Sequence, residues 1–422
     1  MRKYDLIVAG GGFAGLAAAI SAARSGLKVL LFDKSNCLGG AMSNCLVQPF
    51  MLYKTTIDNK PFSLCRGIFE EIITELQSKN KIKNWGNDTL FNDEYLKILL
   101  NRMIVNAGVE VLYHTFLIDV NKEKNRIKSV TVMGCGRKIE IGAKYFIDAT
   151  GNAELSMLSG CPYKVGRTQD GLCQPMTLCF RVANVDIKKL NRHEINVKYN
   201  KFKTEGKIKN PREDVLIFDT LIDGVLHFNT TRVIKLDPCD VFDVTKAEFE
   251  AREQVYEIFD FLKENFDAFS QSEIISTASE IGIRESRMID GEYVLKAQDL
   301  IDLKQFPDAI ALGNYDMDIH NPSGTGTSHY FFKKGEFYSI PYRSLIPKGI
   351  DNMLVGGRCI SAEHEAQAAI RIMPIVCCIG EACGAAIAEA FKENVMTREI
   401  DVEKLKKNLT ASGAMLCYNK ER

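Results

Sequence analysis

The 422-residue sequence predicts an α/β fold in which a Rossmann-type domain carries an inserted α+β domain. Three observations predict this fold: a glycine-rich turn near the start, strands alternating with helices through residues 1–165, and a central stretch that lacks both features. The chain exceeds the size at which a single core usually stops growing, so we expect two domains. The first is predicted to be discontinuous, over residues 1–165 and 340–422, and the second to occupy residues 166–339.

The glycine-rich turn has the spacing of a dinucleotide-binding motif. Gly10, Gly12 and Gly15 form G-x-G-x-x-G directly after the apolar run 6–9. The first glycine permits a tight turn, the second lets the backbone approach a pyrophosphate, and the third lets the helix pack closely on the strand. The exposed N–H groups and the positive end of the helix dipole then favour a bound anion.

An acidic residue follows at the expected distance. Asp33 closes the apolar run 28–32, about 20 residues after the glycines, where a carboxylate accepts a hydrogen bond from a ribose hydroxyl. Lys34 comes next, and a second glycine pair, Gly39 and Gly40, ends the unit. Together these residues predict a dinucleotide site at the start of the chain.

The remaining elements follow from hydrophobic periodicity and turn residues. In the first domain we expect a helix over 93–107 and strands at 109–113, 117–120, 127–133 and 144–149. In the second we expect strands at 176–182, 225–229 and 280–283, a helix over 246–265, and a loop-rich segment over 308–337. A strand at 352–355 and an Ala-rich helix over 366–391 then return the chain to the first domain.

Charge and hydropathy exclude several partners. The 54 lysines and arginines balance 54 aspartates and glutamates, so there is no electrostatic argument for nucleic acid or an anionic membrane. The most apolar C-terminal stretch, residues 366–391, is interrupted by Arg371, Pro374, Glu381 and Glu389. It predicts a buried or half-buried helix rather than a membrane span.

The cysteines indicate a reducing compartment. There are thirteen of them, with no C-x-x-C pair and no zinc-like cluster, which predicts free thiols and no metal site. The basic start and the apolar run that follows imitate a signal peptide, but Asp5 and the glycines interrupt it. We therefore expect a cytoplasmic protein.

Arginines supply the most evident binding groups for a substrate. A guanidinium group can fork onto carboxylate or phosphate oxygens, and ordinary ion pairing is the alternative role. The candidates are Arg284, Arg287, Arg343, Arg358 and Arg371. If residues 281–288 are extended, Arg284 and Arg287 point to opposite faces, and Arg287 is our candidate for the site.

Other polar side chains could act beside these arginines. His320 opens a glycine-rich loop and is the acid–base candidate, with His329 and His364 as competitors and a structural role as the alternative. Tyr342 and Arg343 can donate hydrogen bonds to substrate or cofactor, or can simply fix the crossing between the domains.

Eight segments carry a further signal. They are GGGFAGLAAAISAARSG, LGG, NAGVEVLYHT, FIDATGN, GLCQPMTL, GIRESRMIDGEY, IPYRSLIP and NMLVGGRCISAEHEAQAAIRIMP. Together these segments resemble the FAD-dependent oxidoreductases of the glutathione-reductase-like flavoprotein superfamily. The resemblance implies FAD in the glycine-rich turn, Leu117 beside the adenine, and a second contact at Ala149, Thr150 and Gly151. The candidate cofactor contacts are Gly10, Gly12, Phe13, Ala14, Gly15, Asp33, Lys34, Gly39, Gly40, Ala41, Leu117, Ala149, Thr150, Gly151, Gly357, Arg358, Arg371 and Gly380.

The sequence departs from the disulfide reductases of that superfamily. Met42 stands where these enzymes carry the first of two cysteines, and Cys45 has no partner at the required spacing. No second G-x-G-x-x-G follows a strand, so we expect no separate NAD(P)H domain. The resemblance leaves Cys45 near the flavin but argues against a dithiol mechanism.

The resulting hypothesis is an FAD-dependent oxidoreductase that transfers hydride between flavin and a small organic substrate, an anion being compatible with the arginines. An external electron donor or acceptor would complete the cycle. Two alternatives stay open, an NAD(P)-dependent dehydrogenase and a flavin subunit that only relays electrons within a complex. A homodimer is expected from superfamily analogy alone.

Overall fold

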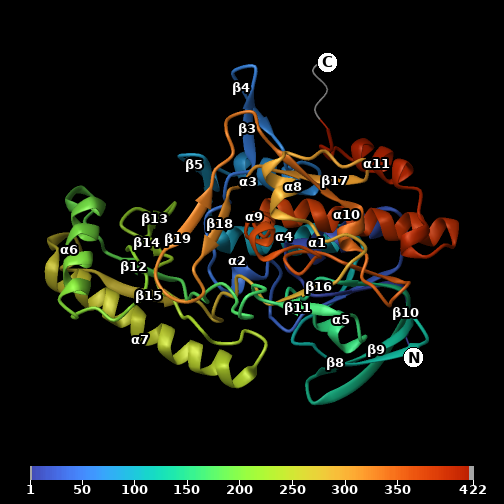
Figure 1. The fold of residues 1–422 in the computed structure, drawn as a ribbon, viewed down its shortest axis with the longest axis horizontal. Coiled ribbons are helices and arrows are strands. Elements are labelled where there is room, and N and C mark those ends of the chain that lie inside the picture. Colours follow the sequence, from blue (N-terminus) through green and yellow to red (C-terminus); the bar gives the residue numbers. More distant parts are fainter. Residues whose placement is uncertain (1, 418–422) are drawn as a thin grey trace.

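The computed structural model describes residues 2–417, so residue 1 and the last residues of the predicted first domain, 418–422, lie outside it. Figure 1 shows a larger lobe built around a sheet and two central helices, and a smaller lobe that contains α6 and α7. The chain starts in the larger lobe, crosses to the smaller one and returns.

The main sheet confirms the predicted Rossmann-type architecture. Its strands occur in the order β7 (Glu110–Leu112), β2 (Val29–Phe32), β1 (Arg2–Ala9), β10 (Arg137–Asp148), β9 (Arg126–Gly134) and β8 (Phe116–Glu123), and β21 (Met353–Val355) also pairs with β10. The pairings of β1 with β2 and β10, of β2 with β7, and of β10 with β21 are parallel, whereas β8, β9 and the first half of β10 are antiparallel. The carboxyl ends of five parallel strands therefore meet at one edge.

Two helices pack against this sheet with unusually close backbones. They are α1 (Phe13–Arg24) and α10 (Met373–Glu393). A Cβ added to Gly380 would lie 2.0 Å from the Ala14 carbonyl oxygen, and one added to Gly384 would lie 2.2 Å from that of Ala18. By length and composition α10 could cross a membrane, but it is mostly buried within the fold, as the interrupted apolar pattern predicts.

The predicted single helix over 366–391 is wrong. The structure has α9 (His364–Ile370) and then α10, separated at Arg371 and Ile372. Pro374 lies in the first turn of α10, where its missing N–H costs no helical hydrogen bond and where proline commonly begins a new helix.

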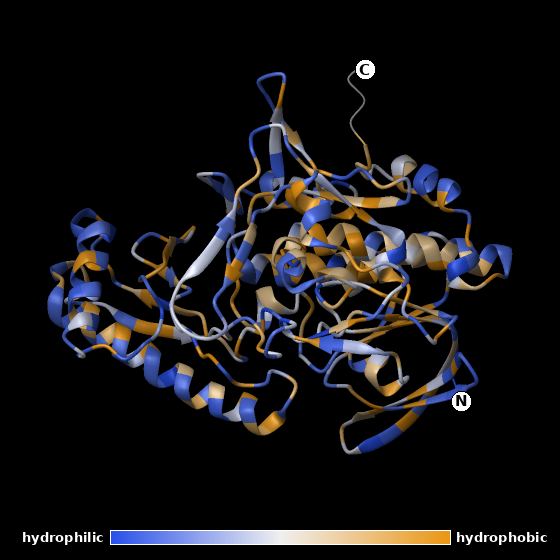
Figure 2. Ribbon diagram, in the orientation of Figure 1, coloured by the Kyte–Doolittle hydropathy of each residue, from blue (hydrophilic) through white to orange (hydrophobic). Residues whose placement is uncertain are grey.

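The smaller lobe has its own antiparallel sheet, in the order β13 (Ile217–Asp219), β14 (Leu226–Phe228), β12 (Phe180–Ala183) and β15 (Glu273–Thr277). It is accompanied by α6 (Arg192–Thr204) and α7 (Val241–Asn265), whose ribbons are largely hydrophilic in Figure 2. The core of this lobe draws on residues between Met176 and Ile281 together with Leu46 from the first part of the chain.

In this region the structure differs from three of the elements expected from the sequence. The helix expected over 246–265 begins at Val241, because the Asp240 carboxylate caps it by accepting hydrogen bonds from the N–H groups of Phe242 and Asp243. The strand expected at 280–283 is an irregular segment with one bridge, between Gly282 and Thr177. The loop expected over 308–337 holds a hairpin of β18 (Met317–His320) and β19 (Thr327–Tyr330).

The remaining elements are short or peripheral. They are α2 (Ala41–Asn44), β3 (Lys54–Ile57), β4 (Lys60–Ser63), α3 (Ile68–Ser78), β5 (Ile82–Trp85), β6 (Asp88–Phe91), α4 (Asp93–Asn106), α5 (Glu154–Leu158), β11 (Tyr163–Val165), β16 (Arg287–Ile289), α8 (Ala297–Ile301), β17 (Ala309–Gly313), β20 (Tyr338–Pro341) and α11 (Val402–Ala411).

Candidate functional site

A pocket lies where the parallel strands end. Gly10, Asp33, Ala149 and Gly356 follow the last residues of β1, β2, β10 and β21, and all four line it. Ligands of open α/β sheets bind at this carboxyl edge, where connections leave in different directions.

The glycine-rich turn presents the start of α1 to the pocket. Gly10 has φ of +100°, and a Cβ there would lie 2.3 Å from the Ala149 carbonyl oxygen, so the turn requires glycine. Gly12 is the N-cap residue of α1 and has no side chain, so no capping group covers the first N–H groups of the helix. A Cβ on Gly12 would project toward the Cα of Gly40 at 3.9 Å, into the space where a phosphate would lie.

Asp33 is oriented at the end of β2 by two backbone hydrogen bonds. One carboxylate oxygen accepts from the Gly11 N–H at 2.5 Å and the other from the Ser35 N–H at 2.7 Å. The carboxylate lines the pocket and, since an ionised carboxylate has about four acceptor positions, it retains capacity for a ribose hydroxyl.

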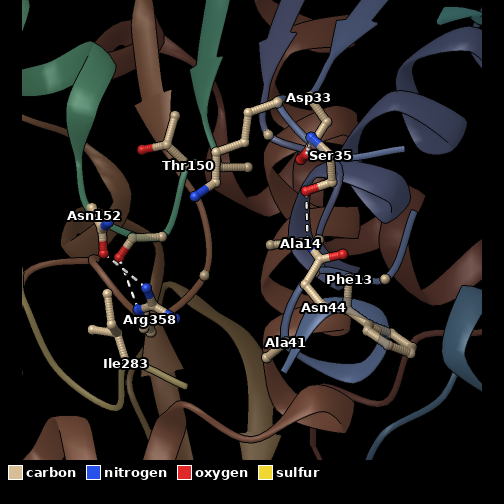
Figure 3. Close-up of a pocket in the computed structure, with 18 of the residues that line it drawn as sticks. Phe13, Ala14, Asp33, Ser35, Ala41, Asn44, Thr150, Asn152, Ile283 and Arg358 are labelled. Atoms are coloured by element: carbon tan, nitrogen blue, oxygen red, sulfur yellow. Dashed lines mark hydrogen bonds between the residues drawn. The ribbon is translucent and has the colours of Figure 1, made fainter. Parts of the chain in front are cut away.

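The opposite wall joins two segments far apart in sequence. The Arg358 Nε donates to the Gly151 carbonyl at 2.9 Å, and its Nη2 donates to the Asn152 Oδ1 at 2.8 Å. Figure 3 shows Arg358, Asn152 and Thr150 on one side of the pocket, across from Asp33 and its neighbours on the other. Thr150 also caps α5, because its Oγ1 accepts from the Glu154 N–H at 2.9 Å.

The inner end of the pocket is mainly apolar and draws on both lobes. Ala41 and Cys45 come from the larger lobe, and Ile281 and Ile283 from the strand-like segment of the smaller lobe. Met373, Val376 and Arg371 complete this end. Apolar walls with a few polar groups suit a flat ring system.

Cys45 lies in this wall as a neutral thiol. Its Sγ donates to the Ile281 carbonyl at 3.7 Å, and burial raises its pKa to about 12. All thirteen cysteines fall within the described residues, and each is free. The prediction of unpaired thiols is therefore met, and Cys45 is protonated at neutral pH.

The pocket contains all the predicted cofactor contacts except Gly15 and Gly380. Both exceptions serve packing: a Cβ on Gly15 would lie 1.8 Å from the Gly10 carbonyl oxygen, and Gly380 lies against Ala14. Sequence reasoning missed several lining residues of the smaller lobe, including Glu280, Ile281 and Ile283. Nothing in their local pattern separates them from a core strand, because only the fold brings them to the pocket.

All four predicted catalytic residues, Arg287, His320, Tyr342 and Arg343, lie outside the pocket lining. Arg287 donates to the Asn152 carbonyl at 3.3 Å and stacks over Tyr163, outside the pocket lining. Tyr342 is fully buried, and its hydroxyl donates to the Thr397 carbonyl at 2.7 Å.

Arg343 also lies outside the pocket lining. It forms an ion pair with Asp308 at 2.9 Å, with 47% of its side chain exposed. The alternative role for Tyr342 and Arg343, fixing the crossing between the domains, stays a prediction.

His320 lies behind the pocket rather than in it. Its Nδ1 is 3.1 Å from the Arg232 Nη2, and because a guanidinium only donates, Nδ1 must accept. The proton is therefore on Nε2, which donates to the Asp318 Oδ2 at 3.2 Å. Burial, together with the positive charge of Arg284, holds the His320 pKa well below its ordinary value. With both nitrogens engaged, His320 positions Asp318 and is not placed to move a proton.

Asp318 in turn holds an arginine that does line the pocket. Its Oδ2 accepts from the Tyr315 hydroxyl at 3.0 Å and from the Arg371 Nη2 at 3.2 Å. Arg371 occupies the break between α9 and α10, and the hairpin β18–β19 carries Asp318 to it. His320 thus reaches the pocket only through these two residues.

These observations match the chemistry of FAD. The helix start suits a pyrophosphate, the Asp33 carboxylate suits a ribose, and the apolar inner end suits the isoalloxazine ring. A Cβ at Gly10 would clash with the backbone of Ala149, which lines the same cradle. The residues present therefore fit the group.

Comparison with known proteins gives the same picture. The sequence profile of the family described as FAD dependent oxidoreductase matches residues 5–409. A thiamine thiazole synthase from Aeropyrum pernix is 30% identical over 163 residues, which cover 36% of this chain and 55% of that protein. A digeranylgeranylglycerophospholipid reductase from Methanosarcina mazei is 28% identical over 156 residues, covering 35% and 38%. The matched part of the chain thus spans about half the length of the first relative and a smaller share of the second.

A solved structure extends the likeness to the whole fold. It is that of a geranylgeranyl bacteriochlorophyll reductase-like protein from Thermoplasma acidophilum, which aligns with a TM-score of 0.51 and 13% identity over 97% of this chain and 84% of that chain. At this identity the match concerns the fold alone.

Proposed function

The chain belongs to the FAD-dependent oxidoreductase family, and from this premise we propose that the enzyme transfers a hydride between the flavin of FAD and a small organic substrate. One observation carries the proposal: the pocket ends in an apolar wall built from both lobes, with Arg371 beside it. A substrate there would be shielded from water and held against the ring system.

Each part of the chain would have a distinct task. The α1 start and Asp33 would hold the adenosine half of the cofactor, and Arg358 would fix the Gly151 segment against it. When bound, FAD supplies two-electron chemistry at its ring. The apolar residues Ile281 and Val376 would orient a substrate and exclude water at that end.

The second half of the cycle requires a redox partner. We expect an external electron donor or acceptor, because the sequence holds one glycine-rich dinucleotide motif and the second lobe is an antiparallel sheet with its own core. Cys45 is a neutral thiol without a disulfide partner, so a dithiol relay is not part of the proposal. Neither the comparisons nor the described pocket supports the two alternatives, a nicotinamide dehydrogenase or a relay subunit.

The test begins with protein purified without added flavin. The expected result is a yellow preparation that releases FAD on denaturation. The bound flavin is then photoreduced without oxygen and mixed with a panel of small carbonyl and enoate compounds, and reoxidation is followed by flavin absorbance. Reoxidation by at least one organic compound supports the proposal. Rapid reoxidation by an electron-carrier protein alone would contradict it and favour a relay.

A further inference from the structure

A group of arginines lies deep in the molecule next to the inner end of the pocket. Arg371 lines the pocket, and Arg284 follows Ile283, which also lines it. Arg284 is tied to the helix that ends at Arg371, because its carbonyl accepts from the Gln367 Nε2 on α9 at 2.9 Å. Burial, followed by the positive charge of Arg371, lowers the pKa of Arg284 to about 9. Arg284 therefore remains charged at neutral pH.

Arg284 has only neutral partners among the described residues. Its Nη1 donates to the Pro175 carbonyl at 2.8 Å and to the Thr177 Oγ1 at 2.5 Å, and its Nη2 donates to the Asn229 Oδ1 at 3.3 Å. Within the described chain, no carboxylate lies within ion-pair distance of it. A deep cation without a counter-charge is costly, so an anion from outside the chain would stabilise it.

Arg371 has donor capacity left over. It shares Asp318 with His320 and Tyr315, and its own contact to that carboxylate is a single one through Nη2. Its Nε is buried and has no hydrogen-bond partner among the described residues. Nε and a neighbouring Nη nitrogen form the planar fork with which arginine binds a carboxylate at two points.

The two arginines behind them are already neutralised. Arg212 lies 2.9 Å from Asp214, and Arg232 lies 3.2 Å from Glu213. With Asp318 on Arg371, three carboxylates contact this group of four guanidinium groups. One positive charge is left unmatched, and it lies at Arg284, next in sequence to the lining residue Ile283.

We infer that Arg284 and Arg371 bind a carboxylate group of the substrate, so that the enzyme acts on an organic acid whose reacting carbons lie over the apolar inner end of the pocket. That the bound acid is the substrate rests on the proposed function. That an anion binds here rests on the two arginines alone. One unmatched charge fits a singly charged carboxylate better than a phosphate dianion. Two planar forks likewise fit a planar ligand group.

The test uses FAD-loaded enzyme and simple probes. Propionate, acrylate and crotonate are each titrated beside the corresponding amide, and inorganic phosphate is titrated in parallel. The readouts are the flavin difference spectrum and the melting temperature, so the test does not depend on turnover. We expect at least one acid to bind at least ten-fold more tightly than its amide, and more tightly than phosphate.

Variants then locate the site. Arg284→Lys and Arg284→Met should weaken binding of that acid about ten-fold or more, in keeping with a charged hydrogen-bonded pair, and should retain FAD at wild-type stoichiometry. Arg371→Lys should weaken it similarly. Arg252→Met is the matched control, because Arg252 lies on α7, pairs with Glu248 and is 43% exposed; it should bind the acid normally.

The outcomes separate this inference from the proposed function. If no acid outbinds its amide, if phosphate binds best, or if the Arg284 variants bind the acid normally while folded, the inference fails. If acids bind through Arg284 but no organic compound reoxidises the flavin, the anion site stands and the proposed hydride transfer fails. If only Arg371 variants have an effect, and that effect is loss of FAD, Arg371 serves the cofactor and the inference fails.

Discussion

Asp33 illustrates what a single residue contributes before any ligand binds. Its carboxylate already accepts hydrogen bonds from Gly11 and Ser35, which join the glycine-rich turn to the end of β2. The acceptor is therefore pre-oriented, so little conformational entropy has to be lost when a ribose hydroxyl arrives.

Replacing this carboxylate should weaken cofactor binding. Asp33→Asn keeps one acceptor oxygen but turns an –NH₂ group toward a backbone donor. A hydrogen bond to a charged group is lost, which should reduce the binding free energy of FAD by about 1.5–3 kcal/mol. That corresponds to roughly a 10- to 100-fold higher Kd for FAD. The Kd is measured by fluorescence quenching on flavin-free protein. Asp223→Asn, at an exposed position in the smaller lobe, should have no effect; equal affinities for both variants would remove Asp33 from the site.

Glu381 provides a pH-dependent prediction. It is buried on α10 and accepts from the Ile68 N–H at 2.9 Å, so it caps α3. Burial raises its pKa from 4.5 to about 7, so the folded protein keeps this proton over a range in which the unfolded chain has lost it. The contribution to the free energy of unfolding is therefore present below pH 4.5 and lost as the pH rises through 7, by about 3 kcal/mol at most.

The measurement is urea unfolding of wild type and Glu381→Gln between pH 5 and pH 8, a range that brackets the shifted pKa. Glutamine can still accept from Ile68 but does not titrate, so the variant should lose less stability than wild type as the pH rises. Glu70→Gln, an exposed change on α3, should follow the wild-type curve. Parallel curves for Glu381→Gln and wild type would show that Glu381 is not the titrating group.

At the residue scale, most of the predicted cofactor contacts line the pocket and none of the predicted catalytic residues does, for a physical reason. Gly10, Gly12 and Asp33 act through local backbone geometry, which their spacing encodes. The role of His320 depends on Arg232, which lies 88 residues away, and that of Tyr342 on Thr397, which lies 55 residues away. No local pattern contains those partners.

At the scale of elements, the break between α9 and α10 had the largest consequence. The Ala-rich stretch reads as one helix because its apolar residues continue through the break, although Pro374 was visible in it. In a continuous helix the direction of the Arg371 side chain would follow the helical repeat. The break between α9 and α10 releases this residue from the repeat, and it lines the pocket. Hydrophobic periodicity predicts that this stretch is helical, but it does not define where each helix ends.

The contact between α1 and α10 gives an element-scale prediction. Gly380→Ala places a methyl group 2.0 Å from the Ala14 carbonyl, so the helices must separate. Overpacking of this kind costs about 1–3 kcal/mol. Because Ala14 lines the pocket, FAD affinity should fall along with the melting temperature. Gly324→Ala, where an added Cβ meets nothing within 4 Å, is the control; similar melting temperatures for the two variants would contradict the packing argument.

At the scale of the whole molecule, the fold class could be predicted from the sequence, but the way in which the two lobes meet could not. The segment around Ile281 looks like an apolar strand, and its place in the pocket arises from long-range contacts. Ser279 and Glu280 both donate to the Asn44 carbonyl, across 235 residues or more. Such contacts follow from tertiary packing and carry no periodic signal.

One ion pair links the lobes at the pocket itself. The Lys34 Nζ lies 3.1 Å from the Glu280 Oε2, and both residues line the pocket. We expect this pair to slow release of FAD, because parting the lobes at this place requires breaking it. The side chains are 49% and 40% exposed, so the coupling should be modest, about 0.2–1 kcal/mol, and should weaken in high salt.

A double-mutant cycle measures this coupling. Lys34→Met and Glu280→Gln are made singly and together, and the rate of FAD release is followed by recovery of flavin fluorescence at low and high ionic strength. Each single change should speed release by up to about five-fold, and the double variant should release FAD no faster than the faster single variant. Removing Lys34 also removes any direct contact that it makes with the cofactor, but this effect is the same with or without Glu280 and cancels in the cycle. Additive effects at low salt would therefore mean that the lobes are held together at the pocket by the backbone contacts around Asn44 and not by this pair.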